Sequence, residues 1–165
     1  MWAVLVVSHT GQLMEQTALT GSRIGARFAS GYARTLLHVV SIPAVIAMAV
    51  IVFLLALWRG SRRRALWAAG TIAATNASAQ LLKHTLLWRP DFGLSQRWDA
   101  ANTLPSGHTA VAASTAVALV LVVGARWRSL TAWVGALLAA AMGYSTLVCQ
   151  WHRPSDVLAG IFVPV

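Results

Sequence analysis

The sequence predicts an all-α protein built as a polytopic bundle of membrane helices, and three observations lead to this prediction. Of the 165 residues, 58% are hydrophobic and only 10% are charged, whereas soluble domains carry about a quarter charged residues. The hydrophobic residues form blocks close to the roughly 20 residues that cross a bilayer as a helix. The basic residues, which give a formal net charge of +9, gather at the ends of these blocks.

Four membrane spans are expected from the apolar blocks. They cover about residues 36–58, 65–88, 109–124 and 131–149. The first contains Pro43 near its start, which membrane helices tolerate. The second is less apolar and includes Asn76, Gln80 and Lys83, so we expect it to face the bundle interior rather than lipid.

The connections between these spans predict an orientation in the membrane. The tight turns at 59–64 and 125–129 contain six arginines and no acidic residue, and the positive-inside rule makes them cytoplasmic. The segments 9–35, 89–108 and 150–155 are expected as loops on the opposite side. We therefore expect these loops on the extracytoplasmic face of a bacterial-type plasma membrane.

Both ends of the chain are apolar but too short to span. We interpret residues 1–7 and 157–165 as partial spans of a six-helix core whose first and last helices are truncated. The alternative is a four-span protein with two interfacial ends. In either case residues 1–165 form a single integral-membrane domain.

Three short segments on the extracytoplasmic side carry residue types suited to phosphate chemistry. They are residues 83–90, 105–108 and 145–156. Ser106 is a good N-cap before an apolar block, and Gly107 lets a ligand approach the backbone closely. A helix beginning there would offer free N–H groups and a favourable dipole to an anion. His108, in the first turn, could donate a proton to a leaving oxygen.

The other two segments supply cations and a histidine–carboxylate pair. Lys83 and Arg89 lie at the outer end of a span, where cations are costly unless they meet an anion. His152 and Asp156 are four residues apart and share a face if the helix extends back to His152. The carboxylate could then orient the imidazole for nucleophilic attack.

In order and spacing, the three segments resemble the type 2 phosphatidic acid phosphatase superfamily, in its membrane lipid phosphatase branch. The superfamily pattern is K-x6-R-P, then P-S-G-H, then S-R-x5-H-x3-D, and the resemblance covers about residues 83–156. Fourteen residues separate Pro90 from Pro105, and 36 separate His108 from Ser145, as the superfamily pattern allows.

The resemblance implies a phosphohistidine mechanism that needs neither a cofactor nor a metal. His152 would be the nucleophile, Asp156 its orienting acid and His108 the general acid for the leaving group. The phosphate would be bound by the remaining matched residues, Lys83, Arg89, Ser106 and Gly107.

Two positions depart from the superfamily pattern. Only five residues lie between Lys83 and Arg89, and a one-residue shift rotates Lys83 by about 100° on a helix. The arginine of the third motif is replaced by Thr146. Three interpretations are open: Arg153 substitutes for this arginine, another clamp such as Arg97 replaces it, or activity is weak or lost.

We expect a membrane phosphatase that hydrolyses a lipid phosphate or a polyprenyl (pyro)phosphate, because a lipid headgroup is presented at the interface where the site would lie. Nucleic acid is not an expected partner, since the basic residues flank apolar blocks. One alternative is phosphate transfer to an acceptor other than water. The other is a catalytically degenerate membrane protein that binds lipid phosphate, for which Thr146 is the only support.

Overall fold

The protein is all-α in the computed structural model, which describes residues 1–24, 26–39, 42–58, 61–94 and 102–164. These residues form eight α-helices and one π-helical turn, with no strand among them. The elements are α1 (Trp2–Leu5), α2 (His9–Gly21), α3 (Ala26–Val39), α4 (Ile42–Trp58), α5 (Arg62–Leu81), the π-turn η1 (Leu82–Leu86), α6 (Gly107–Val122), α7 (Ala125–Val148) and α8 (Pro154–Phe162). The all-α prediction is confirmed.

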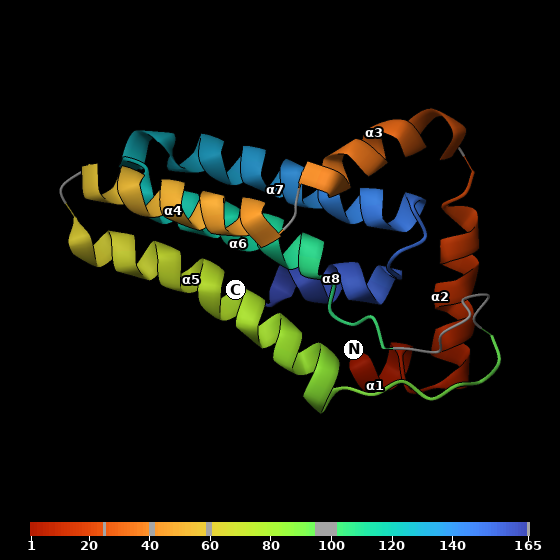
Figure 1. The fold of residues 1–165 in the computed structure, drawn as a ribbon. Coiled ribbons are helices and arrows are strands. Elements are labelled where there is room, and N and C mark those ends of the chain that lie inside the picture. The colour runs from red at the N-terminus through yellow and green to blue at the C-terminus, as the bar shows by residue number, and fades with distance from the viewer. Residues whose placement is uncertain (25, 40–41, 59–60, 95–101, 165) are drawn as a thin grey trace.

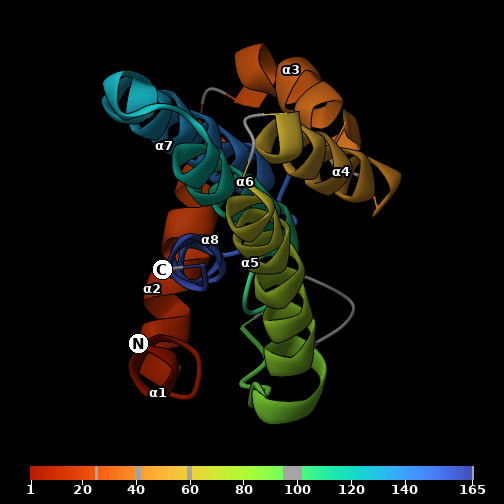
Figure 2. The same cartoon turned by 90° about the vertical axis from the view of Figure 1, so that its left-hand side faces the viewer.

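Helix α6 lies at the centre of the bundle. It packs against α4, α5, α7 and α8, and the view along the helices shows these neighbours around it (Figure 2). Helix α3 lies along α7, while α2 stands across one end of the bundle (Figure 1). The long helices are therefore covered at one end by an N-terminal helix that runs across them.

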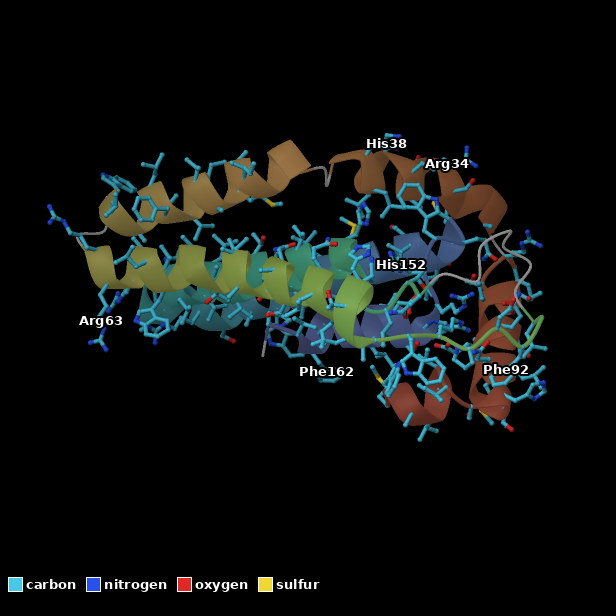
Figure 3. The ribbon with its side chains drawn as sticks, turned by 60° about the horizontal axis from the view of Figure 1, so that its bottom comes forward. Arg34, His38, Arg63, Phe92, His152 and Phe162 are labelled. Carbon is cyan, nitrogen blue, oxygen red and sulfur yellow. The ribbon has the colours of Figure 1, made fainter. Side chains whose placement is uncertain are left out.

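Helices α4 to α8 alternate in direction (Figure 1). Helices α5 and α7 end at the side where α6 and α8 begin, and α2 crosses the bundle at the same end (Figure 1). Arg63 lies at the opposite end from His152 (Figure 3). The three motif segments thus meet at one end of the bundle, and the arginine-rich turn lies at the other.

Small side chains allow the central helices to pack closely. The buried cluster between α4, α5 and α6 includes Ala56, Ala65, Ala68 and Ala118. Between α6 and α7, a Cβ added at Gly135 would lie 2.5 Å from the Cβ of Ala116. Small residues at helix contacts are typical of packing in membranes, where backbones must approach closely to gain van der Waals contact.

The single span predicted for residues 36–58 is wrong. Helix α3 ends at Val39 and a separate helix, α4, begins at Ile42. Pro43 lies in the first turn of α4, where its missing N–H costs nothing because the first N–H groups of a helix have no partner within it. The proline therefore marks a helix start rather than a tolerated interruption.

The loop predicted for residues 9–35 is also wrong, because most of it is helical in α2 and α3. Ser8 caps α2 by accepting a hydrogen bond from the Gly11 backbone N–H at 3.0 Å. The turns predicted at 59–64 and 125–129 are helical from the points where α5 begins, at Arg62, and α7 begins, at Ala125. When helices are predicted from hydrophobicity alone, charged residues in the first turn of a helix are assigned to the connection before it.

The membrane-span prediction is supported for one helix. Within the described residues, only α7 is both long and apolar enough to cross a membrane, with 24 residues and a mean hydropathy of 1.4. Helix α6 and residues 46–58 of α4 are apolar but shorter. The segments predicted as partial spans contain only the short helices α1 and α8.

Candidate active site

His152 and Asp156 are in contact at the start of α8. The His152 Nδ1 lies 3.3 Å from Asp156 Oδ2, and both side chains are buried. Because α8 begins only at Pro154, the pair does not sit on one continuous helix as the sequence suggested, yet it still forms. An ionised carboxylate can only accept a hydrogen bond, so Nδ1 is the donor in this contact, and in the neutral form of the ring Nε2 is then the nitrogen without a proton.

The same carboxylate oxygen of Asp156 accepts two further hydrogen bonds. The donors are the Thr103 hydroxyl at 2.6 Å and the Arg153 backbone N–H at 2.9 Å. Burial would raise the pKa of Asp156, but the hydrogen bonds from His152, Arg153 and Thr103 outweigh it and hold the pKa below its usual value. Asp156 is therefore charged at neutral pH and able to orient the imidazole.

The segment 105–108 begins α6, as the sequence predicted. Ser106 is the N-cap and accepts hydrogen bonds from the Thr109 backbone N–H at 3.4 Å and from the Thr109 hydroxyl at 3.0 Å. The backbone N–H of Ser106 donates to the Asp156 carbonyl at 2.8 Å, which ties the starts of α6 and α8 together. A Cβ at Gly107 would meet no atom within 4 Å, so the backbone there is open to a ligand.

His108 lies one residue before the span predicted from 109, with its ring 5.6 Å from the ring of Trp151. Burial lowers the pKa of His108, and the charges of His152 and Lys83 lower it further. The structure therefore brings His108 into the electrostatic environment of His152 and Lys83. A bound anion would counteract the neighbouring positive charges and favour the protonated ring.

Lys83 lies in η1, where the helix widens to a π-turn closed by the hydrogen bond from the Leu87 N–H to the Leu82 carbonyl at 2.9 Å. The rotation of 100° per residue assumed from the sequence does not apply to a π-turn. The charge of Lys83 acts on Asp156 and on His108. The shortened spacing before Arg89 thus coincides with a local change of helix type at the site.

Arg89 is buried and pairs with a residue that the motifs did not indicate. Its Nη1 lies 3.4 Å from Glu15 Oε2, and 5% and 3% of the two side chains are exposed. Glu15 lies in α2, in a segment that we expected to be a loop. The sequence gives only a weak indication that Glu15 belongs to the site, namely that it is one of only four acidic residues in a strongly basic chain.

Thr146 is fully buried and supports the backbone of Trp151 and His152. Its hydroxyl donates to the Gly143 carbonyl at 2.7 Å, and its carbonyl accepts from the N–H groups of Trp151 at 2.9 Å and His152 at 3.3 Å. Arg153 is also buried, and its Nη1 donates to Thr103 Oγ1 at 3.1 Å. Arg153 is thus beside the His152–Asp156 pair, whereas Arg97 lies outside the described residues.

Thr103 is the second site residue that sequence reasoning missed. It connects the Arg153 guanidinium to the Asp156 carboxylate, although 53 residues separate it from Asp156. Within the described ranges no group of three or more His, Cys, Asp or Glu side chains could hold a metal ion. The residues brought together are instead cations, histidines and two carboxylates, Glu15 and Asp156, around a helix N-terminus, and the cations and the helix N-terminus suit a phosphate group.

Comparison with known proteins identifies the family. No curated protein and no solved structure matches the chain. The sequence model of the PAP2 superfamily matches residues 64–164, a range that includes every site residue predicted from the sequence. The chain therefore belongs to the PAP2 superfamily, a family of phosphatases that use a histidine nucleophile.

Proposed function

We propose that this protein is a membrane phosphatase that hydrolyses a lipid phosphate or a polyprenyl (pyro)phosphate through a phosphohistidine on His152. The observation that carries the proposal is the contact of His152 Nδ1 with Asp156 Oδ2 at 3.3 Å. It lies where the start of α6 is hydrogen-bonded to the start of α8. An oriented imidazole is thereby placed beside a helix N-terminus that favours an anion.

The proposed reaction has two steps. In the first, His152 Nε2 attacks phosphorus, the N–P bond forms, and the P–O bond to the leaving group breaks while His108 gives its proton to the leaving oxygen. In the second, water attacks the same phosphorus, His108 takes its proton, and the N–P bond breaks to release inorganic phosphate. Lys83, Arg89 and the N–H groups after Ser106 would neutralise the phosphoryl oxygens, which is the main demand of phosphoryl transfer.

Arg153 is the proposed substitute for the arginine that Thr146 replaces. Its side chain is only 2% exposed and reaches Thr103, the residue that donates to Asp156. Arginine matches phosphate oxygens with a planar fork of donors. A buried guanidinium this close to the nucleophile's partner is in a position to assist a phosphoryl group.

An apolar cavity favours a substrate with a hydrocarbon chain. A cavity of about 520 Å³ lies between α3, α4, α6 and α7 and is lined almost entirely by apolar side chains. Val111 lines it three residues after His108, and Met142 lines it four residues before Thr146. From Met142 the lining follows α7 back to Leu130, a rise of about 18 Å. A lipid chain in this cavity would begin beside the site.

The outer surface also favours a membrane location. Large hydrophobic side chains are exposed on the long helices, among them Leu54, Leu66, Trp133 and Leu137, each more than half exposed. Exposed apolar side chains in this number on the long helices favour contact with lipid or with partners. We therefore place the bundle in the membrane and the site at its interface.

The test is phosphate release by the purified protein in detergent. Phosphatidate, phosphatidylglycerophosphate and a polyprenyl pyrophosphate are offered to the wild type and to His152→Ala, with His38→Ala as the matched control. His38 is an exposed histidine, and its Nδ1 lies 2.8 Å from the Arg34 carbonyl oxygen one turn earlier in α3. Release by the wild type and His38→Ala, with at least a thousand-fold loss in His152→Ala, is expected.

Two outcomes would reject the proposal. Undiminished release by His152→Ala would remove the histidine from the nucleophile's role. Failure of the folded wild type to release phosphate from any of the three substrates would favour the catalytically degenerate binder, with Thr146 as the first residue to examine.

A further inference from the structure

Glu15 is a buried carboxylate that the reaction described above does not use. It lies in α2, outside residues 64–164, and only 3% of it is exposed. A buried charge is costly unless it is paired and hydrogen-bonded. A carboxylate in this buried position therefore indicates neighbouring groups that are cationic or that donate hydrogen bonds to it.

The two carboxylate oxygens of Glu15 contact two different segments. Oε2 lies 3.4 Å from Arg89 Nη1, and Oε1 accepts a hydrogen bond from the Ser155 backbone N–H at 3.0 Å. Arg89 follows η1 and Ser155 lies in the first turn of α8, so Glu15 joins elements that are 74 and 140 residues away along the chain. One side chain thus spans both sides of the candidate active site.

The contact with Ser155 supplies a helix cap that α8 lacks. Arg153 occupies the N-cap position, and an arginine side chain has no acceptor with which to bind the first N–H groups. Asp156 accepts a hydrogen bond from the Arg153 N–H at 2.9 Å. Residue 154 is a proline without an N–H, so the next backbone donor is Ser155, and Glu15 accepts from it. Two carboxylates therefore fix the first turn of α8, and the negative charge of Glu15 also suits the helix dipole there.

Gln12, one turn before Glu15, strengthens the contact of α2 with the segment around Arg89. Its Nε2 donates to the Pro90 carbonyl and to the Val6 carbonyl, both at 2.8 Å, and only 3% of Gln12 is exposed. Helix α2 therefore holds both the backbone next to Arg89, through Gln12, and its guanidinium, through Glu15. Figure 3 shows α2 at the His152 end of the bundle, next to the segment that carries Phe92.

We propose that Glu15 is a positioning residue that fixes the Arg89 guanidinium relative to the His152–Asp156 pair. A free arginine side chain loses substantial rotamer entropy when it is ordered, and Glu15 orders this one before a substrate arrives. Arginine has five N–H donors, so one contact with Glu15 leaves others for a phosphate. The inference rests on the proposed function, because it assigns Arg89 to the phosphate.

The experiment compares Glu15→Gln with the wild type and with Ser22→Ala. Glutamine keeps an acceptor for the Ser155 N–H but removes the charge that holds Arg89. Ser22→Ala is the control because it removes contacts of α2 with the Leu147 carbonyl and Gln150 and touches neither Arg89 nor α8. For Glu15→Gln we expect kcat/KM for phosphate release to fall by about ten- to hundred-fold, since small misplacement of a positioning group has effects of this size.

A double-mutant cycle separates positioning from a general structural role. If Glu15 acts through Arg89, Glu15→Gln has little further effect on kcat/KM in an Arg89→Gln background, because coupled residues are not additive. Full additivity would overturn the proposal, and so would an unchanged kcat/KM in Glu15→Gln. If Glu15→Gln does not fold, Glu15→Asp replaces it: its side chain is too short to reach both partners, and an unchanged kcat/KM there would also overturn the proposal.

Binding of inorganic phosphate, followed by calorimetry, keeps the two proposals distinguishable. A wild type that binds phosphate without turnover, and binds it more weakly as Glu15→Gln, would reject the phosphatase and support the positioning role. If the wild type releases phosphate, and Glu15→Gln has the same rate and the same phosphate affinity, the phosphatase would be supported and the positioning role rejected. Ser22→Ala should match the wild type in both measurements.

Discussion

Asp156 Oδ2 is the atom on which the candidate site depends at the scale of single residues. It accepts from the His152 ring, the Arg153 backbone and the Thr103 hydroxyl, so it holds His152, the start of α8 and the loop before α6 together. The lowered pKa of Asp156 shows that these donors favour the carboxylate over the neutral acid. Loss of the charge should therefore disturb the imidazole more than it disturbs the fold.

Asp156→Asn tests this role. Asparagine has nearly the same shape but cannot hold the same imidazole proton with a full negative charge, so kcat should fall by about a hundred- to ten-thousand-fold. Binding of inorganic phosphate should remain close to that of the wild type, because Asp156 is not among the residues proposed to bind the phosphate. Asp91→Asn, at an exposed acid in the loop after α5, is the control. A kcat within a few-fold of wild type would contradict the orienting role.

The pH dependence should report His108. In the proposed mechanism His108 is the general acid and must be protonated. Burial, followed by the charges of His152 and Lys83, lowers its pKa, so in the free enzyme His108 loses its proton at a lower pH than an ordinary histidine does. The alkaline limb of kcat/KM should therefore fall at unusually low pH. In the substrate complex the phosphate dianion favours the protonated ring, so the alkaline limb of kcat should lie at higher pH.

The measurement is the pair of pH–rate profiles for the wild type and His108→Gln. Glutamine cannot act as a general acid, so the alkaline limb should disappear from kcat/KM while the rate falls by about a hundred-fold or more. An alkaline limb that persists unchanged in His108→Gln would assign it to another group.

Local pattern explains which site residues could be predicted from the sequence. His152 and Asp156 lie four residues apart, and Ser106, Gly107 and His108 are adjacent, so short-range spacing indicates their roles. Glu15 meets Arg89 and Ser155 across 74 and 140 residues, and Thr103 meets Asp156 across 53. Such contacts depend on how the helices pack, and a single sequence contains no periodicity that records them.

At the scale of elements, apolar blocks predict where helices lie better than where they begin and end. Helices α6 and α7 match the predicted spans to within a few residues at most boundaries. Two arginine-rich segments that we predicted as connections contain the first turns of helices. Ser61 caps the start of α5, and α7 starts directly after Gly124. The π-turn η1 could not be predicted, since nothing in the local sequence distinguishes it from an α-helical turn.

Gly160 sets the distance between α8 and α6. A Cβ at this position would lie 2.7 Å from the Ser106 carbonyl oxygen, 2.9 Å from Thr109 Cβ and 3.2 Å from the Ala110 nitrogen. Two of these three neighbours are backbone atoms that cannot rotate away. Gly160→Ala should therefore push α8 from the start of α6, lower the Tm and reduce kcat/KM by about ten-fold or more.

Gly70→Ala is the matched control for this substitution. Gly70 lies in the interior of α5, is exposed, and a Cβ there would meet nothing within 4 Å. Alanine is the better helix former by about 1 kcal/mol, so the Tm should stay or rise and the activity should not change. A Gly160→Ala variant that behaves like Gly70→Ala would show that α8 can move without cost to the site.

At the scale of the whole molecule, the arrangement combines an apolar bundle with two polar ends. The sequence predicts the bundle, because hydrophobic blocks and flanking arginines are visible in it, but it does not predict that α2 crosses the end of the bundle (Figure 1). Residues 9–35 contain too few apolar residues to be recognised as structural. Their helical form matters because α2 brings Glu15 and Gln12 to the segment around Arg89.

The orientation of the bundle is open to a direct test. In a Cys149→Ser background, which removes the only cysteine, a single cysteine is introduced as Arg63→Cys or as Phe92→Cys. Both native side chains are exposed, and they lie at opposite ends of the bundle (Figure 3). The excess of arginine at the Arg63 end predicts that this end is cytoplasmic. A membrane-impermeant maleimide should therefore label Phe92→Cys in intact cells and Arg63→Cys only after permeabilisation.

Each result of the labelling has a consequence for the chemistry. The expected pattern requires a substrate whose phosphate is presented in the outer leaflet, since the His152 end of the bundle then faces away from the cytoplasm. The reverse pattern would place the site on the cytoplasmic face and contradict the positive-inside argument. Labelling of both cysteines in intact cells would contradict membrane insertion of the bundle, because opposite ends of a spanning bundle cannot share one aqueous side.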